Sequence, residues 1–253
     1  MLKKLYILLG LLLGFFGNAQ NEVLFDKATE AYNNGEYQKA IEAYIRILEN
    51  DQHSAALYFN LGNAYYKLNE IPESIYYYEK SLLLNPDDQE VRTNLAYAQN
   101  MTLDAIDTLP QTGISRIYKS ITSKLTFDQW AYASVFCMLL FVLLYIAFYY
   151  NRYSTKKRFA FIGSLIALFL CIVFIVFASI EFSSFQSDNP AIIFADEVNV
   201  RSEPNESSED IFTLHSGTKV NVLDSLNDYR KIKLADGKTG WIPATEIRIL
   251  KDY

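Results

Sequence analysis

Two long apolar runs without a single charge stand in the middle of the chain. They read AYASVFCMLLFVLLYIAFYY, at residues 131–150, and FAFIGSLIALFLCIVFIVFASI, at residues 159–180. Each is about as long as the ~20-residue helix that crosses the ~30 Å hydrocarbon core of a bilayer. A core helix of a soluble protein normally keeps a polar face, and these runs show none. The pattern predicts two transmembrane helices.

The segment between the two runs, residues 151–158, is basic and holds no acid. Its four charges are Arg152, Lys156, Lys157 and Arg158. Lys and Arg beside membrane helices are retained on the cytoplasmic side, so this hinge predicts a cytoplasmic turn. Everything before and after the hairpin is then expected on the opposite side of the membrane.

Residues 1–19 have the pattern of a secretory signal peptide. Lys3 and Lys4 precede a short apolar run, and a small-x-small cleavage pattern ends at Ala19. An uncleaved anchor is the alternative, and it gives the same topology. The N-terminal signal and the basic hinge predict the same topology. Together they predict an inner-membrane protein in which the segments on either side of the hairpin both lie in the periplasm.

A 34-residue period of helical character runs through residues 21–101. The period aligns Tyr32 with Tyr66, Tyr44 with Tyr78, Leu48 with Leu82, and Asn60-Leu61-Gly62 with Asn94-Leu95-Ala96. The best copy, LYFNLGNAYYKLNEIPESIYYYEKSLLLNPDD at residues 57–88, resembles the tetratricopeptide repeat closely. The resemblance implies pairs of antiparallel helices that approach closely at Gly62, Ser74 and Ser81. Pro86 ends the second helix, because it cannot donate the next hydrogen bond.

The other copies of this repeat are less regular. In the first copy, residues 22–52, Ala28 replaces the expected glycine and Lys27 the expected leucine. Residues 90–101 supply only the first helix of a third copy, which is either a cap or the start of an incomplete unit. Because about three repeats are needed for stability, we expect a partner, a second copy of the chain or the membrane to complete the stack.

The resemblance also implies a function, because tetratricopeptide arrays bind proteins in the concave groove lined by their first helices. The groove positions of this chain are Phe59, Asn60, Asn63, Tyr66, Asn94 and Tyr97. A carboxylate clamp is not predicted, since Phe25, Thr29 and Glu90 occupy positions where that clamp needs other polar or basic groups. The alternative for each aromatic residue is ordinary packing between helices.

Residues 102–129 form a linker interrupted by Pro110 and Gly113. Apolar residues then recur at helical spacing between basic ones over residues 114–125, which indicates a helix lying at the membrane surface or, alternatively, packed on the repeats. Thr126 and Gln129 have the spacing of a capping box that opens the first membrane helix.

Residues 191–253 change to the two-residue period of β-strands, with turn formers between the runs. Ile232 and Leu234 alternate with Lys231 and Lys233, as half-buried strands require. We expect a small barrel of five or six strands.

This tail resembles a bacterial SH3-like domain, through the opening VNVRSEP at residues 198–204 and the late Gly240-Trp241-Ile242. Some members of that family bind cell-wall peptides and others dock onto protein. A groove would involve Phe212, Tyr229 and Trp241, whereas Phe212 and Trp241 are alternatively core residues, because a small barrel needs its large side chains inside.

Composition and motifs narrow the function classes. The chain is 51% hydrophobic, 21% charged and carries a net charge of -6, so nucleic acid is not an expected partner. Both cysteines, Cys137 and Cys171, lie inside the apolar runs, which leaves no disulfide framework or thiolate metal site. His53 and His215 are isolated, and no nucleotide loop, zinc helix or nucleophile elbow occurs. We expect no catalytic residue, metal or cofactor.

The predicted fold is thus a multidomain membrane protein: an all-α tetratricopeptide repeat domain, a two-helix transmembrane hairpin and a small all-β SH3-like barrel. In this order the chain resembles the BatE family of bacterial aerotolerance (Bat) operons. The resemblance implies a non-enzymatic envelope scaffold that works with other Bat proteins, some carrying von Willebrand factor A-type domains, in stress responses. The rival hypothesis is an envelope sensor whose tail binds peptidoglycan.

Overall fold

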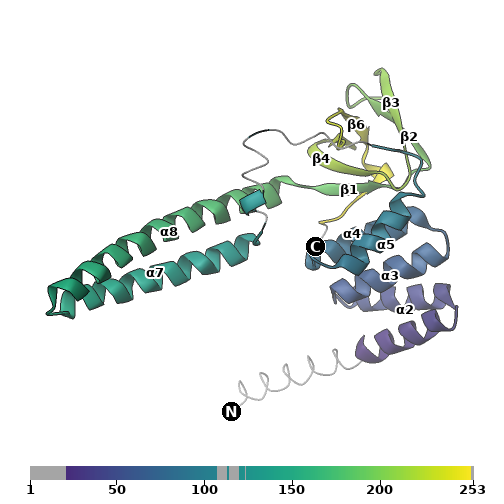
Figure 1. The fold of residues 1–253 in the computed structure, drawn as a ribbon. Coiled ribbons are helices and arrows are strands. Elements are labelled where there is room, and N and C mark those ends of the chain that lie inside the picture. The colour runs from purple at the N-terminus through teal and green to yellow at the C-terminus, as the bar shows by residue number, and fades with distance from the viewer. Residues whose placement is uncertain (1–20, 107–112, 114–119, 123, 252–253) are drawn as a thin grey trace, which may run out of the picture. The chain divides into compact units, whose positions relative to one another are not determined.

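The structure, a computed structural model, describes residues 21–106, 113, 120–122 and 124–251 (Figure 1). The predicted signal peptide and most of the predicted surface helix lie outside these residues. The chain divides into two compact units. One contains the segment up to residue 108 together with residues 189 onward, and the other contains residues 109–188.

The segment with the 34-residue period folds into consecutive helices. A helix over residues 21–33 is followed by α2 (Tyr37–Glu49), α3 (Ala55–Lys67), α4 (Ile71–Leu84) and α5 (Gln89–Gln99). Two of these starts are fixed by side-chain caps, since Ser54 accepts a hydrogen bond from the Leu57 N–H and Asp88 accepts from Val91. The predicted helical repeats are therefore present, including the helix of the irregular first copy.

The closest approach of two helices in the repeat lies at Gly62. A Cβ placed on Gly62 would come within 2.5 Å of the Tyr78 ring, so no larger residue fits between α3 and α4 without displacement. The Ser74 hydroxyl donates to the Gly62 carbonyl at 2.8 Å, and the Ser81 hydroxyl donates to the Ala55 carbonyl at 2.9 Å. The expected roles of the small residues are confirmed.

The last helix of the repeat, α5, is amphipathic. It buries Val91, Leu95 and Ala98, while the residues between them are largely exposed. Residues 101–106, which follow it, are not helical. Of the two alternatives for this helix, the structure favours a cap.

The two apolar runs form a pair of long helices, α7 (Phe127–Tyr150) and α8 (Ser154–Ser187). The capping box is confirmed: the Gln129 N–H donates to the Thr126 hydroxyl, and the Thr126 N–H donates to the Gln129 side chain. Both helices are long and apolar enough to cross a membrane, and most of their residues are exposed within the unit. They are therefore unlike the buried core helices of a soluble protein.

Small side chains line the contact between α7 and α8. The buried residues of the pair are Trp130, Ser134 and Cys137 on α7 and Ala160, Ser164, Ala167 and Cys171 on α8. Such residues let two backbones approach closely, which is how helices associate in lipid. Trp130 also lies in this contact, against Phe174 and Phe177, and its indole N–H donates to the Thr122 carbonyl.

The tail forms one antiparallel sheet of seven strands, in the order β3-β2-β6-β5-β4-β1-β7. The strands are β1 (Pro190–Ile193), β2 (Glu197–Arg201), β3 (Asp210–His215), β4 (Lys219–Leu226), β5 (Tyr229–Lys233), β6 (Thr239–Pro243) and β7 (Ile247–Ile249). The expected count of five or six was too low, because β7 has only three residues and follows a short 3-10 turn, Ala244–Glu246.

The core of this sheet is aliphatic. Ile232 and Leu234 are buried as predicted, together with valine, leucine, isoleucine and alanine side chains from the other strands. Gly240 is required at its position, because a Cβ there would lie 2.3 Å from Val200 Cγ1 and 3.0 Å from the Arg201 carbonyl oxygen. Among the described residues of the tail, the fully buried core side chains are thus aliphatic, and Phe212 is only partly buried against them.

The repeat and the β domain share one hydrophobic core. Ile192 of β1 and Leu250, which follows β7, are both fully buried among the side chains of the repeat, and β1 packs against α4 (Figure 1). Tyr76 of α4 donates a hydrogen bond to the Ile249 carbonyl and packs edge-to-face on Phe194. The β domain of the same chain therefore covers the repeat stack. The sequence had predicted that a partner, a second copy of the chain or the membrane would do so.

Candidate protein-binding site

A groove of about 370 Å³ opens between the first helix, α3, α4 and α5. Its lining residues are Tyr32, Asn63, Tyr66, Lys67, Tyr78, Glu90, Asn94 and Tyr97. Each of the four helices contributes one aromatic ring, and Tyr97 is 59% exposed. The β domain contacts other side chains of α4, such as Tyr76, so the groove stays open in the docked unit.

Four of the six residues predicted for this groove lie in it, and all four come from α3 and α5: Asn63, Tyr66, Asn94 and Tyr97. The other two do not line it. The Phe59 ring centre lies 6.1 Å from the Tyr78 ring centre, and Asn60 is half-buried on α3. Phe59 therefore packs between helices, which was the alternative for the aromatic residues.

The floor of the groove is a small hydrogen-bond network. The Asn63 side-chain oxygen accepts from the Tyr78 hydroxyl at 2.7 Å and from the Asn94 amide at 3.0 Å. Among the described residues, the remaining Asn63 NH₂ and Asn94 oxygen have no protein partner within hydrogen-bond distance. Because a peptide group offers one acceptor and one donor, this pair of amides matches it.

Burial favours the neutral form of two groove tyrosines, Tyr32 and Tyr78. It raises the pKa of Tyr78 far above its ordinary value, although hydrogen bonds from neighbouring side chains act in the opposite direction. Burial also raises the pKa of Tyr32, with smaller contributions from Tyr37 and Tyr44. These hydroxyls therefore act as hydrogen-bond donors over the whole physiological pH range.

Sequence reasoning missed four lining residues: Tyr32, Lys67, Tyr78 and Glu90. Tyr32 and Tyr78 are visible in the repeat alignment, but that alignment shows a shared position without showing which face it occupies. Lys67 and Glu90 bring one positive and one negative charge to the groove, so it has polarity without a net charge.

The β domain carries a second candidate surface, formed by Tyr229 and Trp241. In the β5–β6 pair, Tyr229 lies opposite Pro243 and Lys231 lies opposite Trp241, so the two rings are diagonal neighbours on one face. Arg201 of β2 is paired with Trp241 from the other side, and the Lys231 ammonium lies 5.9 Å from the Trp241 ring centre. Trp241 alternates with the buried Gly240 and Ile242, so it faces outward.

Phe212 does not join this surface. It pairs with the buried Val200 and packs against the aliphatic core, while Lys238 lies 5.9 Å from its ring centre. The predicted trio is therefore divided, because Phe212 pairs with Val200, which faces the core, whereas Trp241 pairs with the next residue of β2, Arg201, on the other face. Each ring had two predicted roles, in the core or in a surface groove. Phe212 packs against the core, and Trp241 lies on the outer face.

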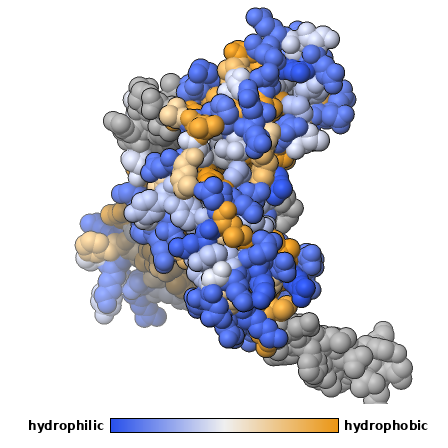
Figure 2. All heavy atoms as spheres, turned by 90° about the vertical axis from the view of Figure 1, so that its right-hand side faces the viewer, coloured by the Kyte–Doolittle hydropathy of each residue, from blue (hydrophilic) through white to orange (hydrophobic). Residues whose placement is uncertain are grey.

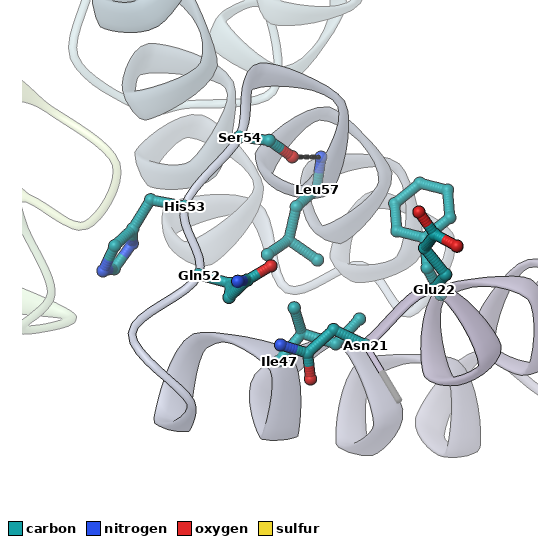
Figure 3. A pocket seen from close by; sticks show the side chains of 8 residues that line it. Asn21, Glu22, Ile47, Gln52, His53, Ser54 and Leu57 are labelled. Carbon is teal, nitrogen blue, oxygen red and sulfur yellow. Dashed lines mark hydrogen bonds between the residues drawn. The ribbon is translucent and has the colours of Figure 1, made fainter. Parts of the chain in front are cut away.

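A smaller pocket of about 220 Å³ lies where the first helix meets α2 and α3 (Figure 3). Its polar groups already serve the fold. Asn21 accepts a hydrogen bond from Asn50, and Ser54 caps α3. The His53 ring points away from Gln52 and Ile47 in this view, and its Nδ1 lies 2.6 Å from the Tyr58 hydroxyl. We assign this pocket no ligand.

The two histidines of the chain thus both have partners within the fold. His215 is the last residue of β3, and its Nδ1 is 2.7 Å from Asp104. Among the described residues, no group of three or more His, Cys, Asp or Glu side chains is arranged to hold a metal ion.

Comparison with known protein families agrees with this architecture. Residues 25–99 match the tetratricopeptide repeat, and residues 196–247 match the bacterial SH3 domain. No curated protein matches the chain. The chain therefore combines a tetratricopeptide repeat domain and a bacterial SH3 domain with two apolar helices, and both matched domains are typically non-catalytic interaction modules.

Proposed function

We propose that the protein is a membrane-anchored scaffold of the cell envelope that binds partner proteins through its repeat groove and its SH3-like domain. The observation that carries the proposal is the open groove, at whose floor the Asn63 NH₂ group and the Asn94 side-chain oxygen are left available by the Asn63–Asn94 hydrogen bond. An extended peptide segment would place a peptide group on these amides and side chains against Tyr66 and Tyr97. Such binding needs no reaction and no cofactor.

The shared core of the two domains supports the proposed topology. Because residues 79 and 219 are in contact, the repeat and the β domain must lie on the same side of any membrane. Two crossings return a chain to the side that it left, so both apolar helices are used as spans in this proposal. The basic hinge at residues 151–158 then puts the two domains in the periplasm, with the hairpin in the inner membrane.

The resemblance to the BatE family extends the proposal to partners. We infer that the scaffold works in a Bat aerotolerance or stress complex, with proteins that carry von Willebrand factor A-type domains. The test is crosslinking in intact cells, followed by recovery of the full chain from membranes. Deleting the repeat would also expose Ile192 and Leu250 of the β domain, so point variants of the groove are the better comparison.

The variant Asn94→Ala/Tyr97→Ala should lose the crosslinked partner, while Asn100→Ala, an exposed residue at the end of α5, should keep it. Recovery of inner-membrane von Willebrand-type proteins that depends on the groove is the expected result. A set of partners that the groove variant leaves unchanged would refute the scaffold proposal in this form.

A second function, binding of cell wall through the β domain, is favoured by one observation. Tyr229 and Trp241 face outward although the core needs neither of them. Half-buried aromatic rings on the outer face, beside Arg201 and Lys231, suit a ligand with flat apolar faces and negative charge, as in peptidoglycan. In this alternative the protein is an envelope sensor.

Co-sedimentation of the full chain in detergent with purified peptidoglycan distinguishes the two functions. The sensor alternative expects sedimentation that Trp241→Ala abolishes and that Leu223→Ala, at an exposed position of β4, preserves. Thermal unfolding of both variants checks that they remain folded. Absence of sedimentation would remove the support for the sensor.

A further inference from the structure

A second cavity, of about 360 Å³, exists only because the repeat and the β domain are docked. The α3–α4 corner contributes Asn69, Ile71, Pro72 and Glu73, the segment after α5 contributes Met101, Thr102 and Leu103, and the β domain contributes Phe194, Asp196 and Ser216. Neither domain alone contains it. It is also separate from the groove, with which it shares no lining residue.

The apolar part of this interdomain pocket is open to solvent. Leu103 is 78% exposed and Met101 is 49% exposed, although both lie in a short segment that the β domain otherwise holds in place. That segment is fixed on both sides, since Asp104 accepts hydrogen bonds from His215 and Thr218 and Ile106 packs on the β-domain core. Large apolar side chains on a fixed segment favour a docking surface.

The polar part of the interdomain pocket is acidic. Glu73 and Asp196 line it from opposite domains, and Glu70 precedes Glu73 by one helical turn. None of these three carboxylates has an ion-pair partner among the described residues. Burial and the neighbouring Glu73 raise the pKa of Glu70, which indicates that negative charge accumulates here. The nearby cation, Arg248, lies 3.9 Å from the Phe194 ring centre and is not among the lining residues.

We propose that the interdomain pocket is a docking site for a segment of a partner protein in which Lys or Arg is flanked by apolar residues. The cationic head would lie between Glu73 and Asp196, and the apolar neighbours would cover Leu103 and Met101. Charge complementarity selects this occupant, because an acidic or neutral segment would leave the carboxylates facing an apolar surface. This site is separate from the groove of the proposed function, and binding at it does not require a ligand in the groove.

The test uses the full chain in lipid nanodiscs and a short peptide of leucine and lysine that carries an uncharged dye. A second peptide has acetyl-lysine in place of lysine, which removes the charge and keeps the side-chain length. We expect the lysine peptide to bind at least about fivefold more tightly, as one partly exposed ion pair allows. Equal affinity for the two peptides would overturn the proposal.

Site variants locate this binding. Glu73→Gln/Asp196→Asn should weaken the lysine peptide about fivefold, whereas Glu206→Gln/Glu209→Gln, which removes the same charge from an exposed turn, should not. Leu103→Ser should also weaken binding, and because that side chain is largely exposed, its loss does not threaten the fold. Binding that persists in the pocket variants, falls equally in the charge control, or falls with Asn94→Ala/Tyr97→Ala would refute the site.

Discussion

Glu79 of α4 and Lys219 of β4 are 140 residues apart in the sequence, and their side chains meet at 2.6 Å. The Glu79 side chain is only 9% exposed, whereas that of Lys219 is 45% exposed. The pair crosses the interface between the repeat and the β domain, beside the apolar contacts of Ile192 and Leu250. A buried carboxylate at an apolar interface needs its partner, so this ion pair specifies how the two domains dock.

Removing one partner of this pair should therefore cost more than removing both. Lys219→Met leaves the Glu79 carboxylate buried without its cation and should lower the free energy of unfolding by roughly 1–3 kcal/mol. The double variant Glu79→Gln/Lys219→Met should recover part of that loss. Thermal unfolding of the full chain in nanodiscs measures both, and strictly additive effects would contradict the coupling.

The stability of the docked unit should fall in acid through Asp104. Burial alone would raise the pKa of this carboxyl, but hydrogen bonds from Thr218 and His215 outweigh burial and hold it below its ordinary value. A depressed pKa stabilises the folded state above the unfolded-state pKa of about 3.9, and this contribution is lost as the pH falls through the folded pKa.

Unfolding temperatures measured between pH 7 and pH 3 check this prediction. Asp104→Asn should be less stable than the parent chain at pH 7, and its stability should change less below pH 4. A parent and a variant that lose stability in parallel would show that other carboxyls dominate the acid response.

Gly62 should tolerate no side chain while Tyr78 is in place. Gly62→Ala puts a methyl group into the Tyr78 ring and should destabilise the repeat by about 1–3 kcal/mol, and Gly62→Leu by more. Combining Gly62→Ala with Tyr78→Leu removes the ring and should cost less than the sum of the two single variants. Unfolding of the four chains gives this comparison, and an unchanged melting temperature in Gly62→Ala would contradict the packing.

The contact of α7 with α8 can be followed through its cysteines. Cys137 and Cys171 are both 6% exposed within the hairpin, so a small permeant maleimide should label them slowly. Ala167→Phe introduces a large ring into the contact and should increase the labelling rate several-fold. Ile166→Phe, at a 55% exposed position, is the matched control and should leave the rate unchanged. Equal rates in both variants would contradict the observed facing residues.

Local patterns were sufficient for most of the fold. The 34-residue period predicted the repeat helices, the uncharged runs predicted the hairpin, and the alternation around Ile232 predicted a buried strand. The spacing of Thr126 and Gln129 predicted a capping box that the structure contains. In each case the signal lies within a few residues of the feature, so no long-range information was needed.

The docking of the two domains could not be deduced in the same way, because it joins segments more than 100 residues apart. One signal was available in α4, where residues 74–81 are all buried and include Tyr76-Tyr77-Tyr78. Large aromatic side chains at three consecutive positions of a helix point in three directions, so one neighbouring helix cannot cover all of them. That pattern indicates that a further element covers α4, but it does not identify the element.

Some of the predicted site residues lie together in the structure and others do not, for a related reason. The 34-residue period makes Asn63 equivalent to Tyr97, and both lie in the groove. It also makes Asn60 equivalent to Asn94, although only Asn94 lines the groove. Phe212 and Trp241 have no such relation. They are paired with consecutive residues of β2, Val200 and Arg201, so strand alternation puts them on opposite faces. The sequence did not show this pairing, because it joins three separate strands.

The shared core also has a consequence for how the protein is made. The ribosome completes the repeat long before it reaches residue 192, so the surface of α4 around Tyr76 is first made without its cover. Both apolar helices are synthesised before the strands that bury this surface. In the proposed topology, final stability therefore depends on events at the translocation machinery, and a chain truncated after the hairpin would leave an aggregation-prone helix uncovered.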